Sequence, residues 1–255
     1  MPLPTTTTPL PTRRSCGASG GARTSTVLAF TVAFTFASGC SKKGEDGPSW
    51  GGGGSPETAL IDDLDDGDGQ IAEVGGRRGA WYVYNDVADG LSPGAQQVPP
   101  AGGDFLPASG GAEGSAFCAQ TSGSGFGSWG AGIGVDLNDD GEGEKHAFDA
   151  SGYTGIRFMA RGNTEIRFSG MIASVLPVAD GGSCQAGPEA ACYDAHGTKI
   201  TLGSEWQQYS IPFSQLLQEG WGAVQAFAPG ELMGLQFQVA TGVAFEFSID
   251  SLHFD

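Results

Sequence analysis

Positive charge is scarce in this sequence. Lysine and arginine number 12 against 29 aspartates and glutamates in 255 residues, so the formal net charge is −17. A surface this acidic repels the phosphates of nucleic acids and the headgroups of anionic lipids, so we expect neither as a partner. The acidity either keeps an exported protein soluble or serves the binding of a metal or a ligand, and composition leaves both readings open.

Catalytic motifs are also few. The three histidines lie far apart, and none has a partner at metal-ligand spacing. The stretch "GLSPG" at Gly90 has proline beside its serine and lacks the strand-to-helix context of a nucleophile elbow. "GFGSWG" at Gly125 precedes a strand, so no helix N-terminus is available for a phosphate. Paired carboxylates can hydrolyse glycosides, but among 29 acids some pair is always close. We therefore expect no enzyme.

Long apolar runs are missing except near the N-terminus. "STVLAFTVAFTF", residues 25–36, follows three arginines and is too short to span a bilayer as a mature helix. It ends in "ASGC", where small residues precede Cys40 as in bacterial lipoprotein signals, although Ala37 stands where leucine is usual. We predict a lipoprotein signal peptide over residues 1–39 and lipidation of Cys40. An ordinary signal peptide cut nearby, with Cys40 incidental, is the alternative.

Glycine, serine, proline and charged residues dominate residues 40–58, which predicts a flexible tether. Ser41 stands where an aspartate marks inner-membrane retention in well-studied lipoproteins, so this resemblance implies the outer membrane or the cell surface. Loss of the signal removes three arginines and no acid, which leaves 9 basic and 29 acidic residues, net −20. We expect a monomer that contacts the membrane through its lipid anchor only.

Four cysteines remain after removal of the signal, in an oxidising compartment. Cys184 and Cys192 lie at the ends of a short Gly/Pro loop, which suits a local disulfide. With Cys40 acylated, Cys118 is expected to be a buried free thiol in the apolar run "SAFCAQ". A disulfide at Cys118 stays open as an alternative, because connectivity cannot be deduced from sequence.

Period-two alternation of apolar and polar residues dominates the remainder of the chain, with clusters of glycine, aspartate, asparagine and proline between the runs. In "GLQFQVA" the apolar residues face one way and the two glutamines the other, as in a sheet with one core face and one wet face. Seven strands are expected at residues 81–86, 155–160, 164–172, 199–202, 207–213, 234–240 and 243–254. This pattern predicts an all-β, two-sheet antiparallel jelly-roll sandwich over residues 59–255.

Two segments depart from this pattern. Residues 213–220, "FSQLLQEG", favour one or two helical turns. Residues 87–113 are rich in glycine, proline and alanine, which favours a long loop.

Acidic residues are concentrated near both ends of the predicted domain. "IDDLDDGDG", residues 61–69, holds five aspartates and predicts a first strand running into a turn, whereas Asp250 lies at the start of the last strand. First and last strands of a jelly roll commonly pair, and calcium takes oxygen ligands from segments that are not adjacent. Two solvated acidic ends are the alternative. "DLNDDGEGE" from Asp136 copies the start of an EF-hand loop but has Ala147 at its twelfth position, so we interpret it as a hairpin loop.

Several stretches occur in an order that resembles the galactose-binding-like jelly rolls, in particular carbohydrate-binding module family 11 and, more distantly, the complex-I intermediate-associated proteins. They are "IDDLDDGDGQI", "GRRGAWYVYND", "WGAGIGVDL", "FDASGYTGIRFMARG", "CYDAHGTKITLGSEWQQYSIPFSQLLQEGWG" and "FSIDSLHF". By position, this resemblance implies a structural calcium at Asp65 and Asp250, with Asp66, Asp68 or Asp149 as helpers. Many relatives have Phe-Glu where this chain has Leu64 and Asp65, which implies a looser calcium site.

The resemblance also implies a polysaccharide ligand of the β-glucan type, bound on the concave face of one sheet. Sugar clefts combine aromatic platforms with hydrogen-bonding side chains. The outward candidates are Tyr82, Tyr84, Arg157, Arg167, Gln236 and Gln238, with Tyr193 and His196 at the rim. Each of these side chains is alternatively a solvated surface group. We expect the tryptophans to pack in the core or in turns, namely Trp129, Trp206 and Trp221.

Three functions are consistent with these observations. The first is a lipid-anchored, non-catalytic carbohydrate-binding module. The second is an envelope structural or protein-interaction lipoprotein without sugar binding, for which we expect a flat or loop-filled face. The third is an accessory protein or hydrolase of cellulose and glucan degradation, because family 11 modules are found attached to cellulases.

Overall fold

The computed structural model describes residues 56–141, 145–187 and 191–255, all within one compact unit of residues 49–255. The predicted signal peptide, the Cys40 lipidation site and the tether up to residue 55 lie outside the described residues. In the part of the chain that the structure describes, no helix is both long enough and apolar enough to cross a membrane.

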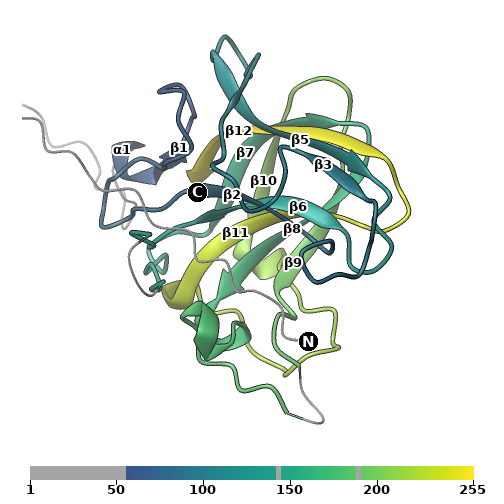
Figure 1. The fold of residues 1–255 in the computed structure, drawn as a ribbon. Helices are drawn as coiled ribbons and strands as arrows, with labels where there is room; N and C mark the ends of the chain where they lie inside the picture. Colours follow the sequence, from purple (N-terminus) through teal and green to yellow (C-terminus); the bar gives the residue numbers. More distant parts are fainter. Residues whose placement is uncertain (1–55, 142–144, 188–190) are drawn as a thin grey trace, which may run out of the picture. The chain divides into compact units, whose positions relative to one another are not determined.

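Two antiparallel sheets pack face to face (Figure 1). The seven-stranded sheet runs in the order β10 (Gln207–Pro212), β7 (Gly155–Gly162), β12 (Phe245–Phe254), β5 (Phe117–Ser124) and β3 (Gln96–Val98), with β1 (Leu60–Asp62) paired to β12 and β4 (Ala108–Ser109) paired to β5. The five-stranded sheet runs in the order β2 (Trp81–Asn85), β6 (Ala131–Asp136), β11 (Leu232–Val239), β8 (Glu165–Ile172) and β9 (His196–Thr201).

Helical segments are short. They are α1 (Pro56–Ala59) and four 3₁₀ turns, η1 (Ala173–Val175), η2 (Val178–Asp180), η3 (Phe213–Gln215) and η4 (Pro229–Glu231). All seven predicted strands are present within a few residues of their expected bounds, so the all-β sandwich prediction is confirmed.

Phenylalanines from both sheets form the centre of the core. Phe158 on β7 lies 5.3 Å from Phe168 on β8 and 5.1 Å from Phe237 on β11, measured between ring centroids, and all three are fully buried. Burying such a side chain contributes about 1.5–3 kcal/mol. The alternation predicted for β2 is also confirmed, because Trp81 and Val83 point into this core.

Two local predictions were met only in part. Residues 87–113 include β3 and β4, and the Gln97 amide in β3 is buried, where it donates to Thr121 Oγ1 and to the Gly132 carbonyl. Residues 213–220 form only the single turn η3, because the Leu217 backbone exchanges two hydrogen bonds with Gly197 instead of continuing a helix. Both misses arise from long-range partners that local composition cannot reveal.

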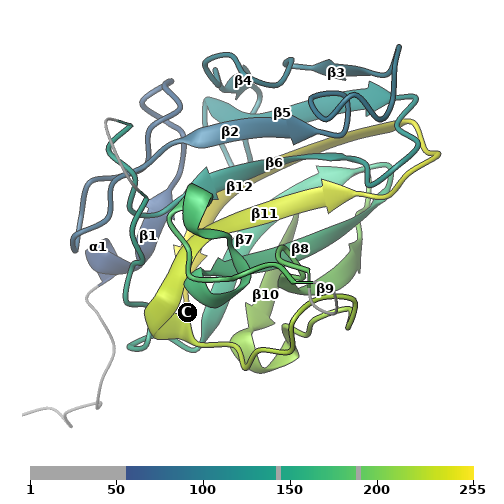
Figure 2. The ribbon, with the colours of Figure 1, turned by 60° about the horizontal axis from the view of Figure 1, so that its bottom comes forward.

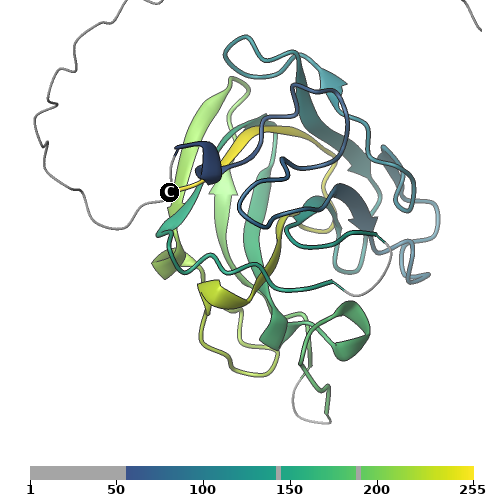
Figure 3. The ribbon, with the colours of Figure 1, turned by 90° about the vertical axis from the view of Figure 1, so that its left-hand side faces the viewer.

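The first and last strands pair, as expected, through Leu60 with His253 and Asp62 with Leu252. The C-terminus accordingly lies beside α1 (Figure 3). Arg77 reinforces this junction. Its buried guanidinium donates to the carbonyls of Thr58 and Leu60, and Phe148 and Phe254 lie against it at 5.3 and 5.4 Å.

The cysteine predictions are confirmed within the described residues. Cys184 and Cys192 form a disulfide with their Cα atoms 5.9 Å apart. Cys118 is a buried free thiol, and burial raises its pKa above the usual value. Such a thiol is unreactive, so its role is packing.

Candidate ligand-binding groove

The outer face of the five-stranded sheet carries two equivalent rows of side chains. In the first row, Tyr82 on β2 lies opposite Gly134 on β6, which in turn lies opposite Gln236 on β11. The tyrosine ring lies over the glycine, since a Cβ at Gly134 would be only 2.5 Å from ring atoms of Tyr82. The Gln236 amide donates to the Tyr82 hydroxyl at 2.9 Å, so this row is closed by a hydrogen bond.

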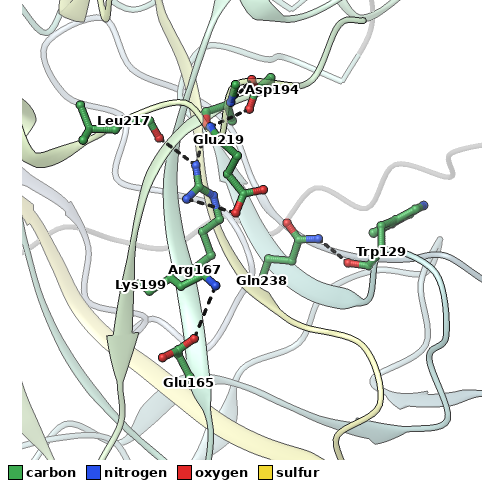
Figure 4. Close-up of polar contacts among 10 residues, drawn as sticks. Trp129, Glu165, Arg167, Asp194, Lys199, Leu217, Glu219 and Gln238 are labelled. Carbon is green, nitrogen blue, oxygen red and sulfur yellow. Dashed lines mark hydrogen bonds and ion pairs between the residues drawn. The ribbon is translucent and has the colours of Figure 1, made fainter. Parts of the chain in front are cut away.

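The second row repeats the first with one difference. Tyr84 lies over Gly132, where a Cβ would be 2.7 Å from the tyrosine hydroxyl, and Gln238 follows on β11. The Gln238 amide, however, donates to the Trp129 carbonyl at 2.6 Å (Figure 4). The Tyr84 hydroxyl is buried and has no hydrogen-bond partner among the described residues. Burial and the nearby Tyr82 raise the pKa of Tyr84 well above its ordinary value, so the hydroxyl stays protonated.

These rows form the floor of a groove of about 1000 Å³. Figure 2 shows the segment that follows β8, which contains η1 and η2, in front of this sheet, where it supplies one wall. Five aromatic side chains line the groove, namely Tyr82, Tyr84, Trp129, Tyr193 and Trp221. The polar lining consists of Asp89, Asp136, Asp139, Lys145, Asp180, Gln236 and Gln238.

The floor rings contact one another and Trp129. Tyr84 lies 5.9 Å from Tyr82 and stacks on Trp129 at 5.9 Å with an interplanar angle of 20°. Such ring pairs add about 0.5–1.5 kcal/mol beyond area burial. The result is a continuous aromatic strip along the groove.

Buried aspartates hold the two turns that present the tryptophans. Asp86 Oδ2 accepts the backbone N–H groups of residues 128–130 at 2.9–3.1 Å, which orients Trp129. Burial alone would raise the Asp86 pKa, but hydrogen bonds from Ser92 and from these N–H groups lower it below the usual value. Asp194 does the same for Trp221, because its carboxylate accepts three backbone N–H groups from residues 219, 220 and 222.

The wall opposite β2 is tied by Tyr193 and the disulfide. The Tyr193 hydroxyl donates to Asp180 Oδ2 at 2.7 Å, and the Tyr193 N–H donates to the Val175 carbonyl at 2.7 Å. Burial, followed by Asp180, raises the pKa of Tyr193 to about 12. The adjacent Cys192 lines the groove and is bonded to Cys184, so the disulfide restrains this wall.

Lys145 is the one cation among the described residues that line the groove. Its ammonium lies 2.5 Å from Asp136 Oδ2, 3.7 Å from Asp139 Oδ2 and 5.3 Å from the centre of the Tyr82 ring. Burial raises the pKa of Asp136, although Lys145 opposes that shift. The lysine charge is therefore neutralised within the protein.

Five of the eight predicted ligand-binding residues lie together in the groove: Tyr82, Tyr84, Tyr193, Gln236 and Gln238. Arg167 follows Gln238 in the second row, but its guanidinium donates to the carbonyls of Ala195 and Leu217 and pairs with Glu219 at 3.8 Å (Figure 4).

The other two predicted residues lie elsewhere. Arg157 is on β7 in the opposite sheet, where it pairs with Asp255 at 3.0 Å. His196 is buried, with Nε2 2.9 Å from the Gln225 carbonyl and its ring against Phe227. Period-two alternation identifies outward residues but does not tell which of the two sheets they belong to.

Sequence reasoning assigned the tryptophans to packing, and for two of them it missed a place in the groove. Trp129 is half-buried in the groove, and Trp221 is 54% exposed there. Trp206 does pack, beneath the Arg161 guanidinium at 4.7 Å. Asp180 and Lys145 were also missed. For Trp129 the available signal was its position two residues before β6, because Gly132 and Gly134 in that strand leave room for the rings of Tyr84 and Tyr82.

The predicted calcium ligands are partly brought together. Asp65 Oδ1 accepts hydrogen bonds from Ser115 Oγ and Ala116 N, and the fully buried Asp250 accepts one from Ala112 N, so both contact the loop of residues 110–117. Burial mainly, and Asp65 to a lesser degree, raise the pKa of Asp250. Asp68 instead accepts a hydrogen bond from Gln70 N. In the described ranges, no group of three His, Cys, Asp or Glu side chains could hold a metal ion.

No protein-family model matches the sequence, and no curated protein matches it. Solved structures that resemble the chain include the family 11 carbohydrate-binding module of the cellulosomal cellulase Lic26A-Cel5E of Clostridium thermocellum, with 15% identity, a TM-score of 0.46 and coverage of 76% of this chain and 92% of that one. Another is a family 11 module of the same organism in complex with a β-1,3-1,4-mixed-linked tetrasaccharide, at 15% identity, TM-score 0.42, and 74% and 95% coverage.

A family 30 carbohydrate-binding module of the Clostridium thermocellum cellulosomal cellulase Cel9D-Cel44B shares 15% identity at a TM-score of 0.41, over 61% of this chain and 84% of that one. The family that the sequence stretches resemble thus recurs among the similar structures.

Proposed function

We propose that this protein is a non-catalytic carbohydrate-binding module that holds a polysaccharide in the groove of the five-stranded sheet. The observation that carries this proposal is a groove lined by five aromatic rings, three of them in contact as a strip, beside the amides of Gln236 and Gln238. The apolar face of a sugar ring packs on an aromatic ring, and its hydroxyl edge needs hydrogen-bond donors and acceptors at the same place. This groove supplies both.

The size of the groove favours a chain of sugars over a single one. Its volume of about 1000 Å³ lies at the upper end of the range of small-molecule pockets. Flat, extended chains expose ring faces at regular intervals, which suits a strip of rings better than an isolated platform. We therefore propose a β-glucan-like polysaccharide as the ligand class.

The binding role does not require a catalytic group. The carboxylates in the groove have structural partners, since Asp136 pairs with Lys145 and Asp180 with Tyr193. We propose that the domain captures its ligand without cleaving it. Release of reducing sugar from any glucan by residues 49–255 would contradict this part of the proposal.

Affinity electrophoresis tests the proposal directly. Residues 49–255 are run through gels that hold β-glucans, xylan or mannan, with calcium present. We expect retardation by at least one β-glucan, and loss of that retardation in a Tyr193→Ala, Trp221→Ala double variant. Uniform mobility across the panel would reject the proposal and favour an envelope protein that binds other proteins.

We also propose that the module is lipid-anchored at the outer membrane or cell surface, with residues 40–58 as the tether. The signal sequence before Cys40 supports this. Radiolabelled palmitate should be incorporated into the full chain and not into its Cys40→Ala variant. Equal labelling of the two chains would contradict the anchor.

Calcium is proposed as a structural ion at Asp65 and Asp250. The pair fits in part, because Asp65, in the turn after the first strand, and Asp250, on the last strand, contact one loop, and backbone carbonyls must complete the set. A bound calcium there supplies stability to the strand junction and no chemistry. Chelation should lower the melting temperature of residues 49–255 but not of the Asp250→Asn variant, which has lost half of the pair.

A further inference from the structure

The charge of the groove is strongly unbalanced. Four aspartates and one lysine line it among the described residues, and that lysine is paired with Asp136 and Asp139. The other two carboxylates, Asp89 and Asp180, form no ion pair in the described part of the chain. They accept hydrogen bonds from neutral donors, Asp89 from Trp129 Nε1 at 3.1 Å and Asp180 from the Tyr193 hydroxyl at 2.7 Å.

Asp89 and Asp180 line the same groove from different parts of the chain. Asp89 follows β2, and Asp180 lies in η2 in the segment after β8. Asp180 is hydrogen-bonded to the Tyr193 hydroxyl, and the charge of Asp89 also acts on that hydroxyl. Both carboxylates therefore lie beside aromatic rings of the groove, Asp180 at Tyr193 and Asp89 at Trp129.

An independent feature of the floor also indicates a ligand. The Tyr84 hydroxyl is buried without a hydrogen-bond partner among the described residues, although the equivalent hydroxyl of Tyr82 is paired. Buried polar groups are rarely left unpaired in a protein that has no further partner. Tyr84 stacks on Trp129, and Trp129 is itself hydrogen-bonded to Asp89, so Trp129 connects the Tyr84 ring to the carboxylate.

We infer that the groove is selective for a β-linked glycan that carries free amines, and that Asp89 and Asp180 bind its ammonium groups. This inference rests on the proposed function and names the substrate class within it. An ammonium donates to a carboxylate and is attracted to the faces of the neighbouring tyrosine and tryptophan rings. N-acetylation removes that charge, and a uronic acid brings a charge that the four aspartates repel.

Calorimetric titration with short oligomers tests this selectivity. Residues 49–255 are titrated in mildly acidic, low-salt buffer, in which amines are protonated and most aspartates are ionised. The oligomers, of equal length, are β-1,4-linked glucosamine, its N-acetylated form, the matching glucan and a uronic acid. We expect the free-amine oligomer to bind about tenfold more tightly than the acetylated one, and added salt to shrink this difference.

Matched variants distinguish amine binding by the groove carboxylates from attraction by the overall negative charge of the protein. Asp89→Asn and Asp180→Asn should each reduce the ratio of free-amine to acetylated affinity about threefold or more. Asp104→Asn removes one charge from an exposed loop position outside the groove and should leave the preference intact. An equal loss in Asp104→Asn would show that general acidity attracts the amines, and would overturn the inference.

The inference and the proposed function fail in different ways. Binding of the glucan with no preference for the amine overturns the inference and leaves the carbohydrate-binding proposal standing. Tighter binding of the uronic acid oligomer also overturns the inference alone. Absence of binding to every oligomer and to every polysaccharide of the gel panel overturns both.

Discussion

On the five-stranded sheet, the two rows carry tyrosine rings that lie over glycines, followed by the amides of Gln236 and Gln238, and Arg167 follows Gln238 in the second row. On the seven-stranded sheet the outward arginines and Gln120 have partners within the protein. Arg157 binds Asp255, Gln120 contacts Glu246, and Arg161 covers Trp206. The same alternation builds both faces, so alternation does not select the binding face.

The two sheet faces differ because loops stand on either side of the five-stranded sheet. Loops on either side of the five-stranded sheet are tied down by Asp86, by Asp194 and by the disulfide, and they raise walls beside the tyrosines. A flat row of rings thereby becomes the floor of a groove. Four predictions test this comparison, from the largest expected effect to the smallest.

Replacing Gly134 with alanine should disrupt the row of tyrosine rings that distinguishes the face of the five-stranded sheet from that of the seven-stranded sheet. The new Cβ would lie 2.5 Å from ring atoms of Tyr82, so the ring must leave the sheet surface. We expect affinity for the glycan that binds the wild type to fall about a hundredfold, and stability to fall about 1–3 kcal/mol. Calorimetric titration and thermal unfolding measure both changes.

The control for this substitution is Gly152→Ala, because Gly152 has open space around its Cα and no positive φ. It should leave affinity and melting temperature unchanged. A Gly134→Ala protein that binds like the wild type would show that the flat Tyr82 ring is not part of the floor that holds the ligand.

The hydrogen bond between Asp62 and Trp81, which connects the two sheets, should make the free energy of unfolding depend on pH. Asp62 on β1 accepts the Trp81 indole N–H from β2 at 2.7 Å, and burial raises the pKa of Asp62 to about 7 from 3.8. The protonated form is therefore favoured in the folded state. Its contribution to stability is full below about pH 4 and is lost as the pH rises through about 7.

The measurement is the urea unfolding free energy of the wild type minus that of Asp62→Asn, in chelator, between about pH 4 and pH 8. We expect the difference to fall by about 3 kcal/mol across this range. A difference that stays constant would mean that the Asp62 carboxyl titrates alike in the folded and unfolded states.

Trp221→Ala should weaken binding without weakening the fold. The indole is 54% exposed in the groove, so its removal leaves no core cavity. We expect about a tenfold loss of affinity by titration and an unchanged melting temperature. Trp206→Ala is the matched change outside the groove lining, and equal losses in the two variants would contradict the assignment of the groove as the site.

The smallest effect is expected at Arg157 and Arg167, which the sequence pattern predicted together as outward ligand-binding residues. Arg157→Ala should change affinity less than about twofold and stability by less than about 1 kcal/mol, because its ion pair is exposed. Arg167→Ala should lower stability by about 1–2 kcal/mol, since the carbonyls of Ala195 and Leu217 lose their donor. Loss of binding in Arg157→Ala would place the ligand on the opposite sheet.

Much of the fold was predictable from sequence because its causes are local. Alternation in "GLQFQVA" and "WYVYND" sorts core from surface residues wherever one sheet face is buried, and the structure confirms that sorting. Residues whose structure depends on distant partners escaped the prediction. Gln97 is in a strand because Thr121 and Gly132 bind its amide, and Leu217 leaves a helix because Gly197 takes its hydrogen bonds.

The sequence by itself determined a sandwich of alternating strands, the local disulfide and the pool of outward tyrosines and glutamines, because each depends on residues close together in the chain. Only the tertiary structure decided which sheet face becomes a groove. In that structure Arg157 lies on the seven-stranded sheet and His196 is buried. Trp129, Asp180 and Lys145 line the groove together with the tyrosines. The physical reason is that strand order, and not strand pattern, sets which side chains share a face.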